Sequence, residues 1–283
     1  MIVTRIHGGL GNQMFQYAVG RRAAVKSGVP LGLDLTAMAK YRKRSYGLDQ
    51  FVLTKDAQPV DGEAFSRGRG VTRLLRYFRK FSLDRYEVGF PFDPEILELK
   101  PPVRLVGYWQ SEKYFSDMSD LIRSEFALVK PISPERQIIL DRIQTCNAVS
   151  VHVRRGDYVS VQKNKAIFGS CEPEWYKRAT AIASDGMADP VFFVFSDDIP
   201  WAMQHLELRG TAVWVEPLPG GRDAEDLHLM AACRSHVIAN SSFSWWGAWL
   251  DSRREARVVA PSRWFSTDDL DARDIVPMRW IRL

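Results

Sequence analysis

The second half of the chain alternates short apolar runs with segments of helical periodicity. The apolar runs that we interpret as strands cover residues 149–154, 191–195, 211–215, 236–239 and 257–260. Helical patterns fill most of the intervals, at residues 173–185, 200–208, 224–233 and 243–250. Strands joined through helices in this way run parallel, because each crossover returns the chain to the same end of the sheet. The pattern therefore predicts an α/β fold with a doubly wound parallel sheet.

The first half opens in the same manner. Strands are predicted over residues 2–6, 31–35 and 103–108, and helices over residues 13–27 and 112–126. Pro131, Ser133 and Pro134 then interrupt the pattern, and Ser133 is suited to cap a helix that runs to about Thr145. We therefore place a domain boundary there. One Rossmann-like domain is expected over residues 1–132 and a second over residues 133–283.

Composition narrows the class of protein. With 283 residues, 46% of them hydrophobic and 26% charged, the chain has the make-up of a soluble globular protein. Its three cysteines are far apart and follow no metal-ligand or redox spacing, which predicts a reducing compartment and no disulfide framework. The chain does not open like a secretion leader, and its apolar runs are too short to span a bilayer. We therefore expect a cytoplasmic protein.

Positive charge is concentrated in one stretch. The net charge is only +5, but residues 66–85 hold seven basic residues and one acid, Asp84. Within this stretch, residues 71–81 have a cationic, amphipathic helical pattern. A solvated surface helix and a peripheral contact with the anionic inner face of a membrane both fit this pattern. Nucleic acid is not expected as a partner, because the stretch contains no recognised nucleic-acid motif.

His152 and Arg154 lie at the carboxyl end of the first strand of the second half. Ligands of open α/β sheets bind at this end of the strands. Two adjacent guanidinium groups, from Arg154 and Arg155, favour a bidentate anion such as a phosphate. The alternative is a surface salt bridge from either arginine to Asp157, which contributes little to stability.

A glycine-rich loop, HGGLGNQ, follows the first strand of the chain. Such a loop at the start of a helix lets backbone N–H groups approach an anion or a sugar. The dinucleotide-binding fingerprint is not matched, since Met14 stands where a third glycine belongs. A tight turn without a ligand remains the alternative.

Three longer stretches are together more informative about the function than any one of them alone. They are HGGLGNQMFQYA at residues 7–18, HVRRGDY at 152–158 and DLHLMAACRSHVIANSSFSWWGAWL at 226–250. Shorter matches are GYWQSEKYF at 107–115, VFSDD at 194–198 and APSRWF at 260–265. In this order the set closely resembles the α-1,2-fucosyltransferases of glycosyltransferase family 11. The resemblance covers almost the whole chain and is weakest over residues 54–102.

The resemblance implies a fold, a reaction and substrates. The fold is GT-B-like, with two facing Rossmann-type domains, the first on the acceptor side and the second binding the donor. The reaction moves L-fucose from GDP-fucose, with inversion, to the 2-hydroxyl of a galactose residue in an oligosaccharide or surface glycan. No metal and no other cofactor is implied. The acceptor beyond galactose is left open and includes lipid-linked glycans.

The resemblance also assigns residues to the donor. Arg154 would bind the β-phosphate, with His152 beside the nucleotide. Gly9, Gly11 and Asn12 would close the site from the opposite domain. Physical chemistry agrees with the role of Arg154, because a fixed guanidinium stabilises the negative charge that builds on a departing diphosphate.

Three further residues are assigned to the donor in the same way. Asp226 would bind guanine, and Ser242, sixteen positions later, would bind the phosphate, with Ser241 beside it. A carboxylate that pairs with guanine N–H donors explains a preference for guanine over adenine. Both serines also suit the role of helix N-cap. The tryptophans of the following helix are interpreted as core residues more than as a platform for a sugar: Trp245, Trp246 and Trp249.

An inverting transfer needs a group that takes the proton from the acceptor hydroxyl. Asp157, in the loop of Arg154, is our choice for this base. It has three competitors: Asp157 orients Arg154 or His152 instead, His7 of the glycine loop is the base, or an oxocarbenium-like transition state needs little help from a base.

Other functions are weighed against this reading. Asp269 and Asp271 have the DxD spacing of metal-dependent glycosyltransferases, but they lie in an acidic, loop-like run. The histidines form no zinc-binding pair. A different GDP-fucose-dependent fucosyltransferase would lack the NSSFSWWGAW signature. A catalytically inactive sugar-binding or nucleic-acid-binding protein is the remaining alternative.

Overall fold

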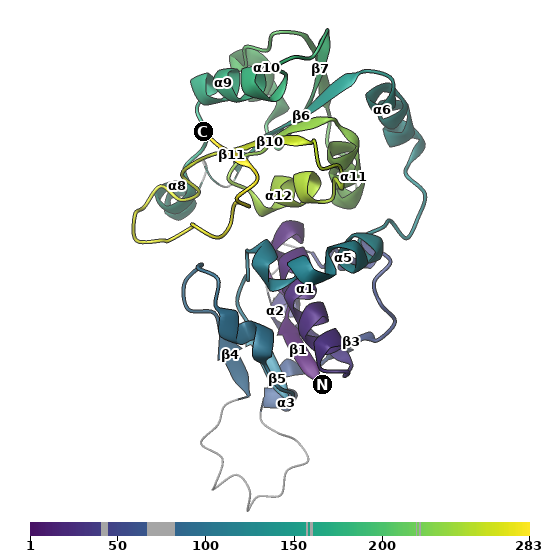
Figure 1. Ribbon diagram of the computed structural model, residues 1–283, viewed down its shortest axis with the longest axis vertical. Coiled ribbons are helices and arrows are strands. Elements are labelled where there is room, and N and C mark those ends of the chain that lie inside the picture. Colours follow the sequence, from purple (N-terminus) through teal and green to yellow (C-terminus); the bar gives the residue numbers. More distant parts are fainter. Residues whose placement is uncertain (41–44, 67–82, 157, 159–160, 219, 221) are drawn as a thin grey trace, which may run out of the picture. The chain divides into compact units, whose positions relative to one another are not determined.

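The computed structural model describes residues 1–40, 45–66, 83–156, 158, 161–218, 220 and 222–283 (Figure 1). These residues form two compact units, Met1–Val129 with Arg273–Ile275 and Lys130–Ala272 with Val276–Leu283. Each unit contains one parallel sheet, so the predicted α/β class is confirmed. The sequence placed one boundary, after residue 132, and did not predict that residues 273–275 belong to the first unit.

The first unit is built on a five-stranded sheet with the order β3-β2-β1-β5-β4. Its strands are β1 (Ile2–Arg5), β2 (Leu31–Asp34), β3 (Ala57–Val60), β4 (Asp84–Tyr86) and β5 (Val103–Val106). All of its pairings are parallel. The apolar strand β1 is central and is followed by the glycine loop, so this loop lies at the middle of the sheet's carboxyl edge.

Ion pairs inside this sheet join strands that are not all neighbours. The buried guanidinium of Arg104 on β5 contacts Asp34 on β2 at 3.1 Å and Asp84 on β4 at 2.7 Å. Removing either carboxylate would leave charge poorly compensated in the interior, which is costly. The network therefore fixes the register of β2, β5 and β4 around β1.

Helix α1 (Leu10–Lys26) begins earlier than the predicted start at residue 13. Gly9 has the extended backbone of an N-cap, and its carbonyl accepts the N–H groups of Asn12 and Gln13 at 3.0 and 3.1 Å. Gly11 and Asn12 therefore belong to the first helical turn and not to the loop, which corrects our expectation. Sequence periodicity missed this turn because glycine and asparagine are poor helix formers.

The helix predicted over residues 112–126 is broken. It consists of two 3₁₀ turns, η3 (Glu112–Tyr114) and η4 (Ser116–Met118), and helix α5 (Ser119–Glu125). Phe115, between the two turns, has φ −146° and ψ 13°, outside the helical region. Its side chain is nevertheless buried. The apolar spacing thus marked residues that are buried, such as Phe115, Ile122 and Phe126, while the continuity of the helix was wrong.

The second unit is built on a six-stranded sheet with the order β11-β10-β9-β6-β7-β8. Its strands are β6 (Asn147–Val153), β7 (Pro190–Ser196), β8 (Thr211–Val215), β9 (Ser235–Val237), β10 (Arg257–Ala260) and β11 (Ile281–Arg282). All of its pairings are parallel. Strand β6 lies between β7 and β9, which places its carboxyl end at the centre of the edge where we expect the ligand.

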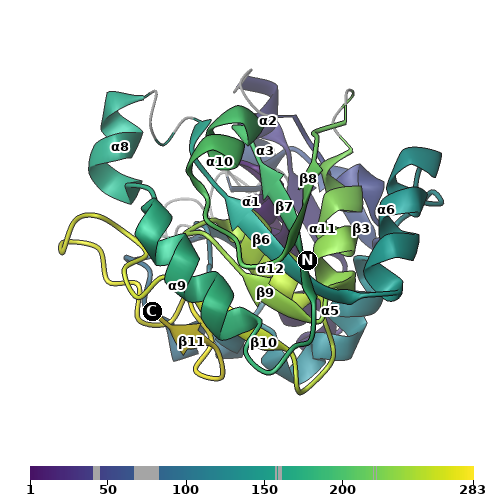
Figure 2. The same cartoon turned by 90° about the horizontal axis from the view of Figure 1, so that it is seen from above.

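Helices cover both faces of this sheet. Its helices are α6 (Pro134–Gln144), α8 (Gln162–Phe168), α9 (Pro173–Ala183), α10 (Ile199–His205), α11 (Asp223–Ala232) and α12 (Ser242–Trp249). Helices α9 and α10 pack on one face, against Val149, Val151 and Val153 of β6. Helices α6 and α11 pack on the other, against Ala148 and Phe193. Figure 1 shows the two layers on either side of the sheet, and Figure 2 looks down on the face that carries α9.

Short elements escaped sequence analysis because most of them span too few residues to show a periodic pattern. These are β3, β4, β11, α8, α2 (Thr36–Lys40), α3 (Gly62–Ser66), η1 (Leu48–Gln50) and η2 (Pro94–Glu98). The amphipathic segment 71–81 lies outside the described residues. Arg85, at the end of the basic stretch, is described and pairs with Asp93 and Glu95. Among the described helices, none combines the length and apolar character that crossing a bilayer requires.

Candidate active site

His152, near the carboxyl end of β6, is buried and electrically neutral. Its side chain lies beside the ring of Phe243, and its carbonyl accepts the hydroxyl of Tyr176 at 3.2 Å. Burial, together with the nearby Arg154 guanidinium, lowers the pKa of His152 to about 3. Its buried Nδ1 has no hydrogen-bond partner within the part of the chain that the structure describes. The ring therefore offers a neutral polar group near Arg154.

Arg154 is anchored by a carboxylate from the next strand. Its Nη1 lies 2.7 Å from Oδ2 of Asp197, which follows β7, and its guanidinium lies over the ring of Tyr158 at 5.3 Å. Asp197 also accepts the backbone N–H of Arg155 at 2.9 Å. A Cβ at Gly156 would lie 2.5 Å from Oδ2 of Asp197, so a side chain there would displace the carboxylate that holds Arg154. Asp197 thus fixes both the loop and the arginine.

Arg155 is directed to a different partner. Its guanidinium lies 3.7 Å from the centre of the Trp201 ring and 3.4 Å from Oδ2 of Asp198. The ion-pair partners that the structure describes for the two arginines are Asp197 for Arg154 and Asp198 for Arg155. Asp157, the carboxylate we expected as partner or base, lies outside the described residues. Of the two arginines, Arg155 is the one committed to packing on α10.

Asp226 lies in the first turn of α11 and is paired with an arginine that the sequence analysis did not single out. Nε of Arg136, on α6, lies 2.7 Å from Oδ1 of Asp226. Arg136 also donates to the carbonyl of Glu216 at 2.7 Å, which holds it in place. Burial raises the pKa of Asp226 to about 6, although Arg136 acts in the opposite direction. The carboxylate is thus ionised at neutral pH and sensitive to mild acid.

The amino end of α12 lies at the same edge of the sheet as Arg154, because β9, which precedes it, pairs directly with β6. Ser241 is the buried N-cap residue, and its carbonyl accepts the N–H of Trp245 at 3.0 Å. Ser242 is the first residue of the helix. Unpaired backbone N–H groups and the helix dipole favour an anion at this position. The three tryptophans are buried and pack on one another, as expected of core residues.

Asn240, just before this helix, holds two neighbouring loops. Its Nδ2 donates to the carbonyls of Phe168 at 2.8 Å and Trp264 at 3.1 Å. Beside it opens a pocket of about 380 Å³ whose lining includes Phe168, Trp175, Arg263 and Phe265. Aromatic faces with a few polar groups are typical of a site for a small polar ligand such as a sugar.

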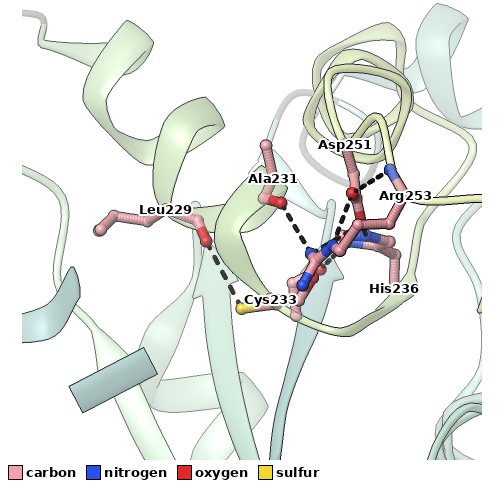
Figure 3. Close-up of polar contacts among 7 residues, drawn as sticks. Leu229, Ala231, Cys233, His236, Asp251 and Arg253 are labelled. Carbon is pink, nitrogen blue, oxygen red and sulfur yellow. Dashed lines mark hydrogen bonds and ion pairs between the residues drawn. The ribbon is translucent and has the colours of Figure 1, made fainter. Parts of the chain in front are cut away.

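A buried polar cluster fixes the other end of α12 (Figure 3). Asp251, just after the helix, accepts from Nε2 of His236 at 2.9 Å and pairs with Arg253 at 2.8 Å. Arg253 in turn donates to the carbonyls of Ala231 and Cys233. The order Ser150, His236, Asp251 is that of a hydrolase triad, since Oγ of Ser150 lies 2.9 Å from Nδ1 of His236.

Although these three side chains are arranged like a catalytic triad, their role is to hold the structure together. The pKa of His236 is lowered by burial, and neither His236 nor Ser150 is open to a substrate, with exposed fractions of 0% and 3%. The cluster joins β6, β9 and the segment after α12. It therefore fixes the axis of α12, and with it the position of the N–H groups at the opposite end of the helix.

In the first unit, the glycine loop is held by amide side chains. Gly8 has φ +83°, and a Cβ there would lie 2.9 Å from Nδ2 of Asn12. Nε2 of Gln13 donates to the carbonyl of Gly8 at 3.0 Å, and Nε2 of Gln110 donates to Oδ1 of Asn12 at 2.7 Å. A Cβ at Gly9 would meet only open space. Gly8 thus favours glycine for its conformation, whereas a side chain at Gly9 would meet no steric obstacle.

The predicted site residues fall into two groups. His152, Arg154, Ser241 and Ser242 lie at the carboxyl edge of the second sheet, and Asp226 lies in the first turn of α11, the helix that follows β8. Gly9, Gly11 and Asn12 lie in the first unit, at the carboxyl end of β1. The described residues contain no group of three or more His, Cys, Asp or Glu side chains that could hold a metal ion.

Sequence analysis missed the residues that hold the site together. Asp197 and Asp198 stand in the VFSDD stretch, and two acids directly after a buried strand are a signal that would have found them. Arg136 carries no such signal, because its partner lies far away in sequence.

Comparison with known proteins is consistent with this geometry. The model of glycosyl transferase family 11 matches residues 100–283. The chain belongs to this family. It is 34% identical to an α-1,2-colitosyltransferase of Escherichia coli, over 100% of this chain and 99% of that protein. The O-antigen biosynthesis glycosyltransferase WbnK of Escherichia coli is 27% identical, over 92% of this chain and 94% of WbnK.

The chain is also similar to an animal enzyme and to a solved structure. The galactoside α-(1,2)-fucosyltransferase 2 of Oryctolagus cuniculus is 31% identical, over 57% of this chain and 48% of that protein. The crystal structure of NodZ α-1,6-fucosyltransferase soaked with GDP-fucose superposes with a TM-score of 0.51 at 15% identity, covering 88% of this chain and 92% of NodZ. At this identity the likeness establishes the fold, which is GT-B-like. The protein is therefore a GT-B-like glycosyltransferase of family 11.

Proposed function

We propose that this glycosyltransferase moves L-fucose from GDP-fucose, with inversion, to the 2-hydroxyl of a galactose residue. The observation that carries the proposal is the position of Arg154 at the end of β6, beside the amino end of α12 at the same sheet edge. A guanidinium and a helix amino end together suit a diphosphate, which is the leaving group of a GDP-sugar.

The proposed roles follow from the charge that develops during transfer. As the bond from fucose to phosphate breaks, the diphosphate gains negative charge, and a donor already in position stabilises that charge without reorganisation. Asp197 prevents Arg154 from rotating, because it engages Nη1 from the neighbouring strand. The N–H groups at Ser242 would supply the second contact. Neutral His152 would add hydrogen bonding beside the nucleotide without adding charge.

Asp226 is proposed to recognise guanine. Guanine presents two N–H donors on one edge, which a carboxylate can accept together. Arg136 keeps the Asp226 carboxylate in a fixed orientation at 2.7 Å. Gly9, Gly11 and Asn12 are proposed to contribute to the donor site from the first unit, Ser241 to position the α12 turn, and Asp157 to act as the base.

A second donor is favoured by one observation. The Escherichia coli α-1,2-colitosyltransferase shares 34% identity with this chain over its whole length. L-Colitose differs from L-fucose by the absence of the 3-hydroxyl, so a pocket that accepts one can be close in shape to a pocket for the other. We therefore keep transfer of colitose from GDP-colitose as the second candidate.

Release of GDP tests both candidates. The purified protein is incubated with GDP-fucose or GDP-colitose, with and without a β-galactoside, and the linkage of any product is determined by NMR. We expect galactoside-dependent GDP release and an α-1,2 linkage, faster with GDP-fucose. Binding of GDP without transfer to any galactoside would instead support an inactive sugar-binding protein. A higher kcat/KM with GDP-colitose would identify the second candidate as the function.

We further propose that the enzyme acts in the cytoplasm without a metal ion. A lipid-linked glycan at the inner face of the membrane is the acceptor class that a peripheral membrane contact would suit. Residues 66–85 are the candidate segment for this contact.

A further inference from the structure

Gln16 on α1 is a fully buried amide that holds His7, the first residue of the glycine loop, through two contacts. Its Oε1 accepts the backbone N–H of His7 at 2.9 Å, and its Nε2 lies 3.0 Å from Nδ1 of the His7 ring. Nε2 also donates to the carbonyl of Gly107, after β5, at 3.1 Å. The amide thus links the carboxyl ends of β1 and β5.

These contacts fix which atom of the amide is oxygen and which is nitrogen. A reversed amide would place its NH₂ group against the N–H of His7 and its oxygen against the carbonyl of Gly107, which are two repulsive contacts. The group that faces Nδ1 of His7 is therefore an N–H donor. An N–H donor at 3.0 Å requires an acceptor, so Nδ1 carries no proton.

We propose that Gln16 holds His7 as the neutral tautomer with its proton on Nε2, so that His7 donates a hydrogen bond to a substrate oxygen and is not the base. The part that concerns the substrate rests on the proposed transferase function. A second proton on Nδ1 would oppose the Gln16 amide, and the tautomer that could accept a proton at Nε2 would lose the Gln16 contact. Gln16 is thus a positioning residue for His7.

The surroundings of the ring favour its neutral form. Burial and the positive charge of Arg5 on β1 lower the pKa of His7, and a hydrogen bond from the ring to the backbone carbonyl of Arg5 acts less strongly in the opposite direction. The ring of Tyr108, after β5, lies against the imidazole at a centroid distance of 4.8 Å. The imidazole is therefore held from α1 and from the end of β5 while its side chain stays partly exposed.

One variant and one control test whether Gln16 sets the tautomer of His7. Gln16→Glu replaces the N–H donor by an acceptor, so His7 should change to the Nδ1–H tautomer, and its pKa should rise by about one unit or more. Gln58→Glu is the matched control. Gln58 lies on β3, two strands away from β1, and its amide contacts the Lys55 carbonyl at an exposed site.

The tautomer is measured directly by long-range ¹H–¹⁵N correlation spectra of the full ¹⁵N-labelled chain at neutral pH. The His7 signals are assigned by their loss in His7→Gln. We expect a protonated Nε2 in the wild type and in Gln58→Glu, and a protonated Nδ1 in Gln16→Glu. A protonated Nδ1 in the wild type overturns the proposal, and this spectrum decides even if Gln16→Glu does not fold.

The donor role is measured by turnover. His7→Gln keeps an N–H donor at nearly the reach of Nε2, and its kcat should stay within about tenfold of the wild type. His7→Ala, which keeps no donor, should lose about a hundredfold or more. A base at His7 predicts instead that both variants lose about a hundredfold or more, since neither retains a basic nitrogen. Equal losses would overturn the donor role.

The same variants show which substrate oxygen accepts the hydrogen bond from His7. Weaker GDP binding by His7→Ala assigns the oxygen to the diphosphate, and a raised KM for the galactoside at unchanged GDP affinity assigns it to the acceptor. Either result supports a donor. If the protein transfers no sugar, the transferase proposal fails, while the spectra still decide the tautomer.

Discussion

Arg154 at the end of β6 is held by Asp197 at the end of β7, with Nη1 2.7 Å from Oδ2. These strands are neighbours and parallel over their whole length, so both side chains leave the sheet at the same edge. The pair is partly exposed, with 22% and 27% of each side chain accessible. Such a pair adds little stability. The pair instead orients Arg154, because it fixes the plane of the guanidinium that we propose to bind the diphosphate.

Replacing Arg154 by lysine should reduce kcat by about two orders of magnitude or more, because lysine keeps the charge but loses the planar set of donors. Arg155→Lys is the matched control and should matter less, since Arg155 packs on Trp201. Steady-state rates of GDP release provide the measurement. Near-normal turnover in Arg154→Lys would leave only a structural salt bridge.

GDP affinity should depend on the ionisation of Asp226. Its pKa is raised by burial to about 6, so the carboxylate that accepts guanine N–H groups is lost in mild acid. We expect the Kd for GDP to rise about tenfold or more from about pH 8 to about pH 5, and Asp226→Asn to bind weakly throughout. Titration calorimetry measures this. A pH-dependent Kd that persists in Asp226→Asn contradicts the assignment.

The same raised pKa makes the stability of the fold change with pH in the direction opposite to GDP affinity: the contribution of Asp226 to stability falls as pH rises. Folding favours the protonated carboxyl, so the contribution of Asp226 is present below its unfolded pKa of about 4 and is lost as pH rises through about 6. Asp226→Asn should therefore lose less of its unfolding free energy than the wild type over this interval. Denaturant midpoints of the two proteins give the comparison.

Asp157→Asn should lower kcat by about a hundredfold or more while leaving GDP affinity nearly intact, if Asp157 is the base. The acid limb of the pH–rate profile should then disappear. If Asp157 instead positions Arg154, GDP binding weakens together with kcat. Retention of both activity and the acid limb would exclude Asp157 as the base.

Transfer should continue in excess EDTA at nearly the untreated rate, because we assign the stabilisation of the diphosphate to Arg154 and backbone N–H groups. Rates before and after chelation, with and without added Mn²⁺ or Mg²⁺, give the answer. If the transfer rate falls strongly in EDTA and is restored by either cation, the prediction is wrong, and Asp269 and Asp271 become the candidate metal ligands.

Binding to anionic vesicles should decline steeply as salt increases, if residues 66–85 contact a membrane surface. Each basic residue near such a surface contributes about 1 kcal/mol at low salt. Co-sedimentation of the wild type is compared with that of a variant in which Arg73 and Arg76 are replaced by glutamate. Equal recovery in the supernatant with and without vesicles argues against the contact.

Five of the six strands of the second sheet, all but β11, were predictable because each is an apolar run between breaks in the pattern. Residues 211–215 and 257–260 match β8 and β10 as they stand in the structure. Burial on both faces dictates such runs in parallel sheets. Residues 112–126 failed for a related reason: apolar spacing reports which side chains are buried, and Phe115 is buried without being helical.

The two acids after β7 can be noted in the sequence, but their pairing with arginines of the neighbouring strand could not be predicted from it. The loop of Arg154 contained its own acid, Asp157, and local spacing made that acid the natural partner. Asp197 is adjacent only because β6 pairs with β7, a register that no short motif encodes. The amide of Gln16 is a similar case, since its contact with Gly107 joins two strands that are distant in the chain.

The segment Arg273–Ile275 is contributed to the first unit by sequence that otherwise belongs to the second. Asp274 accepts the N–H of Phe92 at 2.8 Å and pairs with Lys113 at 2.6 Å, while Ile275 is fully buried. A chimera of two family members joined near residue 130 would therefore combine each first unit with a foreign carboxylate and a foreign core residue. Exchange of donor specificity between relatives should succeed only when these three residues are inherited with the amino-terminal half.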